Sequence, residues 1–437
     1  MNEAVLTCPS YASNVERQAI LDAAQIAGIK CPKVINEGTA IALKYGFYNS
    51  RDLLKEKPRN VAFVDLGCSK TTVTIAQFTP DKVRIVAHHS DRNLGGRDFD
   101  YAIMEKCAAE FDKKYGNDPM ENVRCKLRIM EACEKARKIL TADSEAGIGV
   151  DYLLDEQDLV RNLKRDEMEE IIKPITDRFA MVCREAVELS KLSVADIEFV
   201  ELLGDCTRTP VITTILKDVF QKTELFRTMK ALECVTEGAT MQAAMLSPSF
   251  TARSFKIEDY NALPLSVTYH FADKPEGKKT MELFTVGSNF PITKSLSFKN
   301  KLGNMSMLLH YNQDPNNLAQ LMKGLPTQLA SYEINEGTLK HSDRESKGEF
   351  VIKVENNLHQ IACLHSAELA ETWTEMEKIP IASAAQNTEP LKEGEEPKPA
   401  PEQKYETKER TRTTHSGIKF DTSSHAIPPQ GKTELRE

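Results

Sequence analysis

The sequence predicts an α/β domain, followed by an antiparallel β-sandwich and then by a disordered tail. Short apolar strands alternate with long helical stretches as far as residue 248, an order that is typical of α/β structure. From residue 249 to 383 the chain consists of short strand-like runs with turn residues between them, which is typical of a sandwich. From residue 384 to 437, Pro, Glu, Lys and Thr dominate and aromatic residues are scarce, so we expect a mobile, charged tail.

The composition excludes several classes of protein. With 57 Lys and Arg against 65 Asp and Glu, the net charge is −8, which argues for solubility and against a general nucleic-acid binder. No apolar run reaches the ~18 residues that a membrane span needs, and residues 1–13 lack the order of a signal peptide. The ten cysteines include no C-x-x-C pair, so we expect reduced thiols in a cytoplasmic protein, with the nucleus as a second location.

The elements of the α/β part are predicted as follows. A strand ends at Leu6, and residues 17–27 and 39–45 are predicted helices on either side of an ordered segment at 33–35. Strands are expected at 60–65, 72–78, 82–88 and 197–203. Helices are expected at 98–142 with a break at 116–119, at 165–192 with Pro174 near a bend or start, after Pro210 and at 237–246.

The sandwich is predicted from five short strand-like runs. They lie at residues 263–271, 280–286, 294–299, 305–311 and 350–354. Turn residues separate them, and their spacing favours antiparallel pairing over crossover connections.

The first candidate site follows the strand NVAFVD, which ends at Asp65. A turn then brings Gly67, Cys68 and Ser69 together, and backbone N–H groups in such turns can face phosphate oxygens. A carboxylate at a strand end can hold Mg²⁺ through water. Taken alone, however, a strand with a tight hairpin explains this segment better than a phosphate site does.

A second turn of this kind lies in VELLGDCTRTPVI. A strand meets Gly204 and Asp205, and a helix begins at Pro210. Helix N-termini favour anions, so this turn is a candidate second wall for phosphates. An ordinary strand–turn–helix junction explains it equally well.

The helical segment ACEKARKIL places four polar side chains on one face. Glu134, Arg137, Lys138 and Thr141 stand at positions i, i+3, i+4 and i+7. Arg and Lys stems can sandwich an adenine ring, while a carboxylate accepts a ribose hydroxyl. Without other support, a solvated helix face is the better interpretation.

A fourth segment, NLGGRDFD, contains Gly95 and Gly96 before a helix that Asp98 can cap. A capped helix start is sufficient to explain it.

Together, these segments resemble the second half of the nucleotide-binding domain of the 70-kilodalton heat-shock family. The resemblance runs from Val5 to Pro248 with little insertion, and its segments are CPSYASNVERQAILDAAQIAGI, VINEGTAIALKYG, FVDLGCSKTTV, LGGRDFD, ACEKARKIL, LLGDCTRTP and MQAAMLSP. It implies an actin-like ATPase fold. Residues 1–56 would be a partial first lobe, and residues 57–248 a complete second lobe with a helical subdomain at about 95–172.

The branch of the family is also indicated. The turn Gly67-Cys68-Ser69-Lys70 is similar to the Gly-His-Ser pattern of the large 110-kilodalton branch, as are SPSFTARSFKIEDYNALPLSVTYHF and VENNLHQIACLHSAELAE. This resemblance implies a stress-response co-chaperone. Such a protein acts as a nucleotide-exchange factor for the ordinary 70-kilodalton heat-shock chaperone and holds unfolded polypeptides. Nucleic acid and membranes are not expected among its partners.

The resemblance also assigns site residues. It implies ATP or ADP with Mg²⁺, and it places Glu37 and Asp65 on the metal side, acting through water. Pro9 and Arg17 match a relay between the nucleotide and substrate domains. The nucleotide contacts are Gly67, Cys68, Ser69, Glu134, Arg137, Lys138, Thr141, Gly204, Asp205 and Arg208.

Several residues depart from the family pattern. Lys70 replaces a threonine of the phosphate turn, Thr72 an acidic residue, Asp205 a glycine and Leu232 an acid. Asp205 would repel phosphates. The family's first phosphate loop, its catalytic lysine and its helical lid are expected to lie outside this sequence. We therefore name no catalytic residue and expect weak or lost nucleotide binding without hydrolysis. The alternatives are an active foldase when full length, and a scaffold or decayed paralogue without nucleotide.

Overall fold

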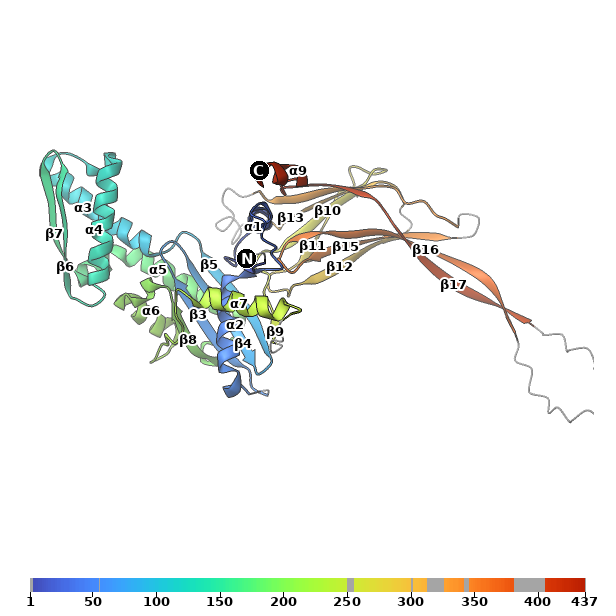
Figure 1. The fold of residues 1–437 in the computed structure, drawn as a ribbon, viewed down its shortest axis with the longest axis horizontal. Helices are drawn as coiled ribbons and strands as arrows, with labels where there is room; N and C mark the ends of the chain where they lie inside the picture. The colour runs from blue at the N-terminus through green and yellow to red at the C-terminus, as the bar shows by residue number, and fades with distance from the viewer. Residues whose placement is uncertain are drawn as a thin grey trace, which may run out of the picture.

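The computed structural model describes residues 3–54, 56–249, 255–299, 302–312, 326–341, 346–380 and 405–436. Figure 1 shows an α/β part at one end and a β-rich part at the other, with both chain termini near their junction. No helix among these residues is long and apolar enough to cross a membrane.

The α/β part is built on a five-stranded sheet with the order β8-β3-β4-β5-β9. The strands are β8 (Ile197–Leu203), β3 (Arg59–Leu66), β4 (Thr71–Thr79), β5 (Lys82–Asp91) and β9 (Lys256–Glu258). β3, β4 and β5 are antiparallel, whereas β8 and β9 add parallel to the two sides. The expected α/β fold is therefore confirmed, and it fits the actin-like ATPase class.

Alternation along β3 sends side chains to both faces of this sheet, because successive strand residues point in opposite directions. Ala62 and Val64 join one core with helices α5 (Arg165–Ser190) and α6 (Pro210–Phe220). Val61 and Phe63 join a second core with α2 and α7, which span Glu37–Asn49 and Cys234–Leu246. Pro174 lies inside α5 rather than at its start.

A helical subdomain extends from this sheet and forms one end of the molecule (Figure 1). It contains α3 (Gly96–Tyr115), α4 (Val123–Ile139) and a hairpin of β6 (Glu145–Leu154) and β7 (Gln157–Lys164). The break expected within residues 98–142 is present, because Gly116 ends α3 with a positive φ of 77°.

The N-terminal segment forms a parallel pair, β1 (Leu6–Cys8) and β2 (Val34–Asn36), with α1 (Asn14–Ile26) between the two strands. Ser13 and Glu16 form a capping box at the start of α1. The sequence therefore predicted this helix, but placed its start three residues late.

The β-rich part contains two antiparallel sheets whose apolar faces share one core. The first has the order β11-β10-β13-β14-β18, with bounds Lys279–Phe284, Leu265–Phe271, Met305–Tyr311, Gln328–Ile334 and Phe420–Ser424. The second has the order β12-β15-β16-β17, with bounds Ile292–Lys299, Lys347–Asn356, Ala362–Pro380 and Tyr405–Gly417.

The prediction of a disordered tail is wrong for three ordered elements. β17 pairs with β16, β18 pairs with β14, and helix α9 spans Pro429–Arg436. Backbone hydrogen bonds order β17 although its side chains are polar, and Arg410 and Arg412 form ion pairs with glutamates of β16. The remainder of the predicted tail, residues 384–404 and 437, lies outside the described residues.

Candidate functional site

Three loops that are far apart in sequence meet at the carboxyl ends of β3 and β8. The amide of Gly96 donates to the carbonyl of Gly67 at 3.0 Å, and the amide of Arg97 donates to that of Cys68 at 2.8 Å. The loop that starts at Gly204 lies against the end of β3. The structure thus brings the two turns that the resemblance assigned to phosphates together with the Gly95–Gly96 segment, to which no such role was assigned.

Two glycines make this close approach possible. A Cβ atom on Gly95 would lie 2.4 Å from the carbonyl oxygen of Cys68, a distance that real contacts do not reach. Gly204 has a φ of +73°, and a Cβ there would lie 2.2 Å from the carbonyl oxygen of Leu66. Both positions therefore require glycine for backbone reasons.

Arg137 joins α4 to this group through a buried ion pair. Its Nε and Nη2 donate to the two carboxylate oxygens of Asp100 at 2.5 and 3.1 Å. Its Nη1 lies 3.8 Å from the sulfur of Cys206, which follows Asp205. Burial raises the pKa of the Asp100 carboxyl even though Arg137 opposes the shift. Arg137 thus fixes the loops, a role that the solvated-face interpretation did not include.

The remaining residues of the α4 motif face solvent. Glu134 and Lys138 form an exposed ion pair of 2.7 Å. Thr141 donates to the carbonyl of Arg137 at 3.3 Å. These side chains are accessible to a ligand at the edge of the loops.

The negative charge of Asp205 is balanced by a nearby guanidinium group. Arg208 lies 3.3 Å from its carboxylate, and both side chains are exposed. Arg227, which sequence reasoning missed, donates to the hydroxyl and the carbonyl oxygen of Thr207 at 2.7 Å each. Burial, followed by the charge of Arg208, lowers the pKa of Arg227. Two guanidinium groups therefore flank this loop.

The two carboxylates assigned to the metal side come from different elements. Asp65 lies near the end of β3, and Glu37 is the first residue of α2. Burial, and then the charge of Glu37, raises the pKa of Asp65 to about 6, although Lys70 opposes the shift. The ammonium of Lys70 forms an ion pair with Glu37.

These groups do not fit a hydrated magnesium ion. Mg²⁺ keeps several of its waters in protein sites, but the cavity lined by Glu37, Asp65 and Thr72 has a volume of about 10 Å³. That volume is at the lower limit for one water molecule. Within the described parts of the chain, no cluster of three His, Cys, Asp or Glu side chains is arranged to hold a metal. Lys70 does not line this cavity, but its ammonium supplies a positive charge beside Glu37.

The relay residues lie where the N-terminal segment meets the β-rich part. Arg17 is only 1% exposed. Its guanidinium donates to Asn36 Oδ1 at 2.6 Å, to the Ala12 carbonyl at 2.9 Å and to the His359 carbonyl at 3.4 Å. The carbonyl of Pro9 accepts from the amide of Ala12 at 3.0 Å.

Asp259 connects this group to the central sheet and was missed from the sequence. It accepts from Thr39 Oγ1 at 2.7 Å and lies 3.7 Å from His88 Nε2. Burial acts to raise the pKa of Asp259, but His88, Lys33 and Thr39 outweigh that effect and hold this pKa below its ordinary value. Asn36 completes the link by donating to Gln360 Oε1 at 3.1 Å. We call Arg17, Asn36, His88, Asp259 and Gln360 the interface cluster.

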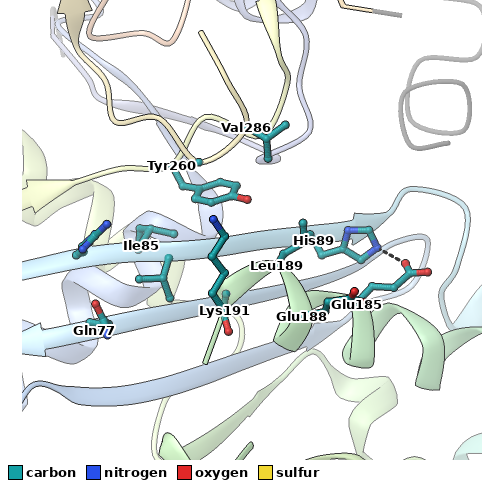
Figure 2. A pocket seen from close by; sticks show the side chains of 13 residues that line it. Gln77, Ile85, His89, Glu185, Glu188, Leu189, Lys191, Tyr260 and Val286 are labelled. Atoms are coloured by element: carbon teal, nitrogen blue, oxygen red, sulfur yellow. Dashed lines mark hydrogen bonds and ion pairs between the residues drawn. The ribbon is translucent and has the colours of Figure 1, made fainter. Parts of the chain in front are cut away.

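A larger cavity lies elsewhere, between β5, the end of α5 and the start of the β-rich part (Figure 2). Its volume is about 790 Å³. Figure 2 shows His89 paired with Glu185, at 2.7 Å, and Lys191 extending toward Tyr260. None of the predicted nucleotide residues lines it.

Comparisons with known proteins agree with this arrangement. A family model described as Hsp70 protein matches residues 1–425. Heat shock 70 kDa protein 16 of Arabidopsis thaliana is 34% identical over 372 residues, covering 85% of this chain and 47% of the relative. A heat shock protein homolog of Saccharomyces cerevisiae is 35% identical over 336 residues, covering 76% and 47%. The 97 kDa heat shock protein of Strongylocentrotus purpuratus is 32% identical over 385 residues, covering 87% and 41%. The chain thus spans about half the length of these relatives or slightly less.

Proposed function

Because the chain belongs to the Hsp70 family, with relatives of the large 110-kilodalton type, we propose that it is a nucleotide-exchange co-chaperone. Its partner would be an ordinary 70-kilodalton heat-shock chaperone, in the cytoplasm and the nucleus. It would also hold unfolded polypeptides. Membership of the family implies nucleotide binding with Mg²⁺, and we propose that in this chain such binding is weak and adenosine-centred.

The observation that carries this proposal is the Lys70–Glu37 ion pair beside Asp65. Transfer of a γ-phosphoryl group needs charge neutralisation from several sides and a positioned metal. Here the turn carries a lysine that is paired with Glu37, and the inner cavity that Glu37 and Asp65 line has room for about one water. The loops themselves are folded, and the Glu134–Lys138 pair, where we place the adenosine, is exposed. This combination favours a nucleotide-responsive binding module over an ATP-driven foldase.

We propose that the α/β part and the β-rich part have different roles. We assign residues 1–56 and 57–248 to the first and second lobes of a nucleotide domain. We assign residues 249–383, together with the strands β17 and β18 that complete the two sheets, to a β-rich domain that receives unfolded polypeptides. The interface cluster supports joint action of these parts, because its buried hydrogen bonds join the N-terminal segment, the central sheet and the loop around Gln360.

Stopped-flow release of fluorescent ADP tests the exchange function. An ordinary 70-kilodalton chaperone is loaded with labelled ADP and mixed with this chain and excess unlabelled ADP. We expect release to accelerate by roughly tenfold, a typical coupling between two sites. The variant Arg184→Met changes an exposed side chain of α5 outside the turn, serves as the control and should accelerate release equally. A release rate equal to that without the chain would contradict the proposal.

Two further measurements separate the alternatives. Steady-state ATP turnover comparable with that of an ordinary chaperone, abolished by Asp65→Ala, would favour the foldase. A complete lack of thermal stabilisation by both ADP and ATP would favour the scaffold. We expect negligible turnover and a small stabilisation of similar size for the two nucleotides.

A further inference from the structure

We propose that the ammonium group of Lys70 takes the place of the metal ion in this site, so that adenine nucleotide binds without Mg²⁺. This inference rests on the proposed nucleotide binding and assigns the residue that sets its metal dependence. Its ligand is the diphosphate group of an adenine nucleotide.

Lys70 is held in place at the end of a turn and remains accessible to a ligand. The residue ends the turn between β3 and β4, and the Gly67 amide donates to its carbonyl at 3.1 Å, which fixes the backbone. Its side chain crosses to Glu37 at the start of α2. The side chains of Lys70 and Glu37 are 24% and 23% exposed, so solvent reaches the pair. An ammonium group has three donors, and one ion pair leaves donors for a phosphate oxygen.

The charges around the turn disfavour a divalent cation. Glu37 and Asp65 are the carboxylates beside the turn, and one ammonium already lies among them. A divalent cation placed between them would be repelled by Lys70 at short range. Thr72, where the family has an acidic residue, is neutral and accepts a hydrogen bond from Ser90 at 3.2 Å. The turn therefore lacks one acidic group and gains one cation.

The space beside the two carboxylates is small. The cavity that Glu37 and Asp65 line has a volume of about 10 Å³, which is the lower limit for a single water molecule, whereas Mg²⁺ in protein sites keeps several waters. The ammonium of Lys70 is attached to the chain and is paired with Glu37 beside this cavity, so it needs no room there for a shell of several waters. Space, charge and connectivity thus agree on an internal cation.

Calorimetric titration of the full chain with ADP tests the inference. Titrations are made in Mg²⁺ and in EDTA, for the wild type and for Lys70→Thr, Lys70→Arg and Glu37→Gln. We expect the wild-type affinity to agree within about twofold between the two buffers. Lys70→Thr should lose roughly tenfold in EDTA, the value of one charge-assisted hydrogen bond, and should recover in Mg²⁺.

Lys70→Arg and Glu37→Gln are the matched controls. Both keep a cation in the turn, so both should remain metal-independent, and thermal unfolding establishes that each variant is folded. A wild type that binds ADP at least tenfold more tightly in Mg²⁺ overturns the inference but leaves the nucleotide site intact. A wild type that binds ADP in neither buffer overturns the inference together with the nucleotide part of the proposed function.

Discussion

Two groups of charged side chains lie near the start of α2, and they differ in their access to water. At the turn between β3 and β4, Lys70 and its partner Glu37 on α2 are each about a quarter exposed. In the interface cluster, Arg17 and Asp259 are 1% and 2% exposed, and hydrogen bonds hold both. An exposed pair exchanges partners with water or a ligand at little cost, whereas a buried charge must keep its partners. The turn is therefore suited to respond to ligands, and the interface cluster to hold a fixed geometry.

The largest effect expected from this comparison is a loss of stability on Arg17→Met. The substitution removes the guanidinium that donates to Asn36 Oδ1 and to the Ala12 carbonyl, and Asn36 Oδ1 keeps the long contact with Cys8 Sγ at 3.9 Å. We expect the free energy of unfolding to fall by about 3 kcal/mol, measured by urea denaturation.

Arg184→Met is the matched control, because Arg184 is 60% exposed and 4.0 Å from Asp218. Its effect should stay within about 0.5 kcal/mol. Equal effects of the two substitutions would show that the interface cluster is no more constrained than the surface.

A smaller effect, of opposite sign, is expected from Asp65→Asn. Since the pKa of Asp65 is raised to about 6, the folded protein holds this proton more tightly than the unfolded chain does. The contribution of the protonated carboxyl to the free energy of unfolding is therefore fully present below about pH 4. It is lost as the pH rises to about 6, and the free energy does not change further with this group above that pH. The substitution should stabilise the protein by about 2 kcal/mol at pH 8 and by little at pH 4.

Urea denaturation at both pH values measures this difference, with the exposed Asp112→Asn as the control. If Asp65→Asn lowers stability at pH 8, the carboxylate is held by favourable contacts, and the contrast between the two groups is smaller than we infer.

The smallest effect is expected at the exposed edge of the site. Glu134→Ala removes the surface ion pair with Lys138, which should change stability by less than about 0.5 kcal/mol. The same substitution should weaken ADP binding several-fold in calorimetry, because we place Glu134 beside the ribose. Unchanged affinity would move the adenosine away from α4, and a large loss of stability would place Glu134 in the packed structure.

The sequence predicted helices and buried strands well, because their periodic patterns are local. The strand over 72–78 and the break before α4 are examples, since each depends on neighbouring residues only. The prediction was wrong for β17, whose sequence ETKERTRTT is polar. That strand is ordered by its pairing with β16, whose partner residues lie from 25 (Pro380 with Tyr405) to 49 (Glu368 with Gly417) positions away along the chain. Composition measures what side chains can bury and misses hydrogen bonds that the backbone makes with a distant strand.

The candidate site was predictable only in part for the same reason. The motifs identified the loops, and the structure brought them together. Their charge partners were not predictable, because Glu37 lies 33 residues from Lys70, and Asp100 lies 37 residues from Arg137. A motif also does not reveal which of its side chains turns inward, and Arg137 does so while Lys138 does not.

The strand β9 has a mechanical consequence. The segment that leads into the β-rich part adds to the edge of the central sheet, where Lys256, Ile257 and Glu258 pair with Lys82, Val83 and Arg84. An ion pair of 2.6 Å between Lys82 and Glu258 reinforces this edge. A force that pulls the β-rich part away along the axis of β9 loads these hydrogen bonds together, in shear, whereas a force across the sheet breaks them one at a time. The resistance of this joint to tension therefore depends on the direction in which the β-rich part is pulled.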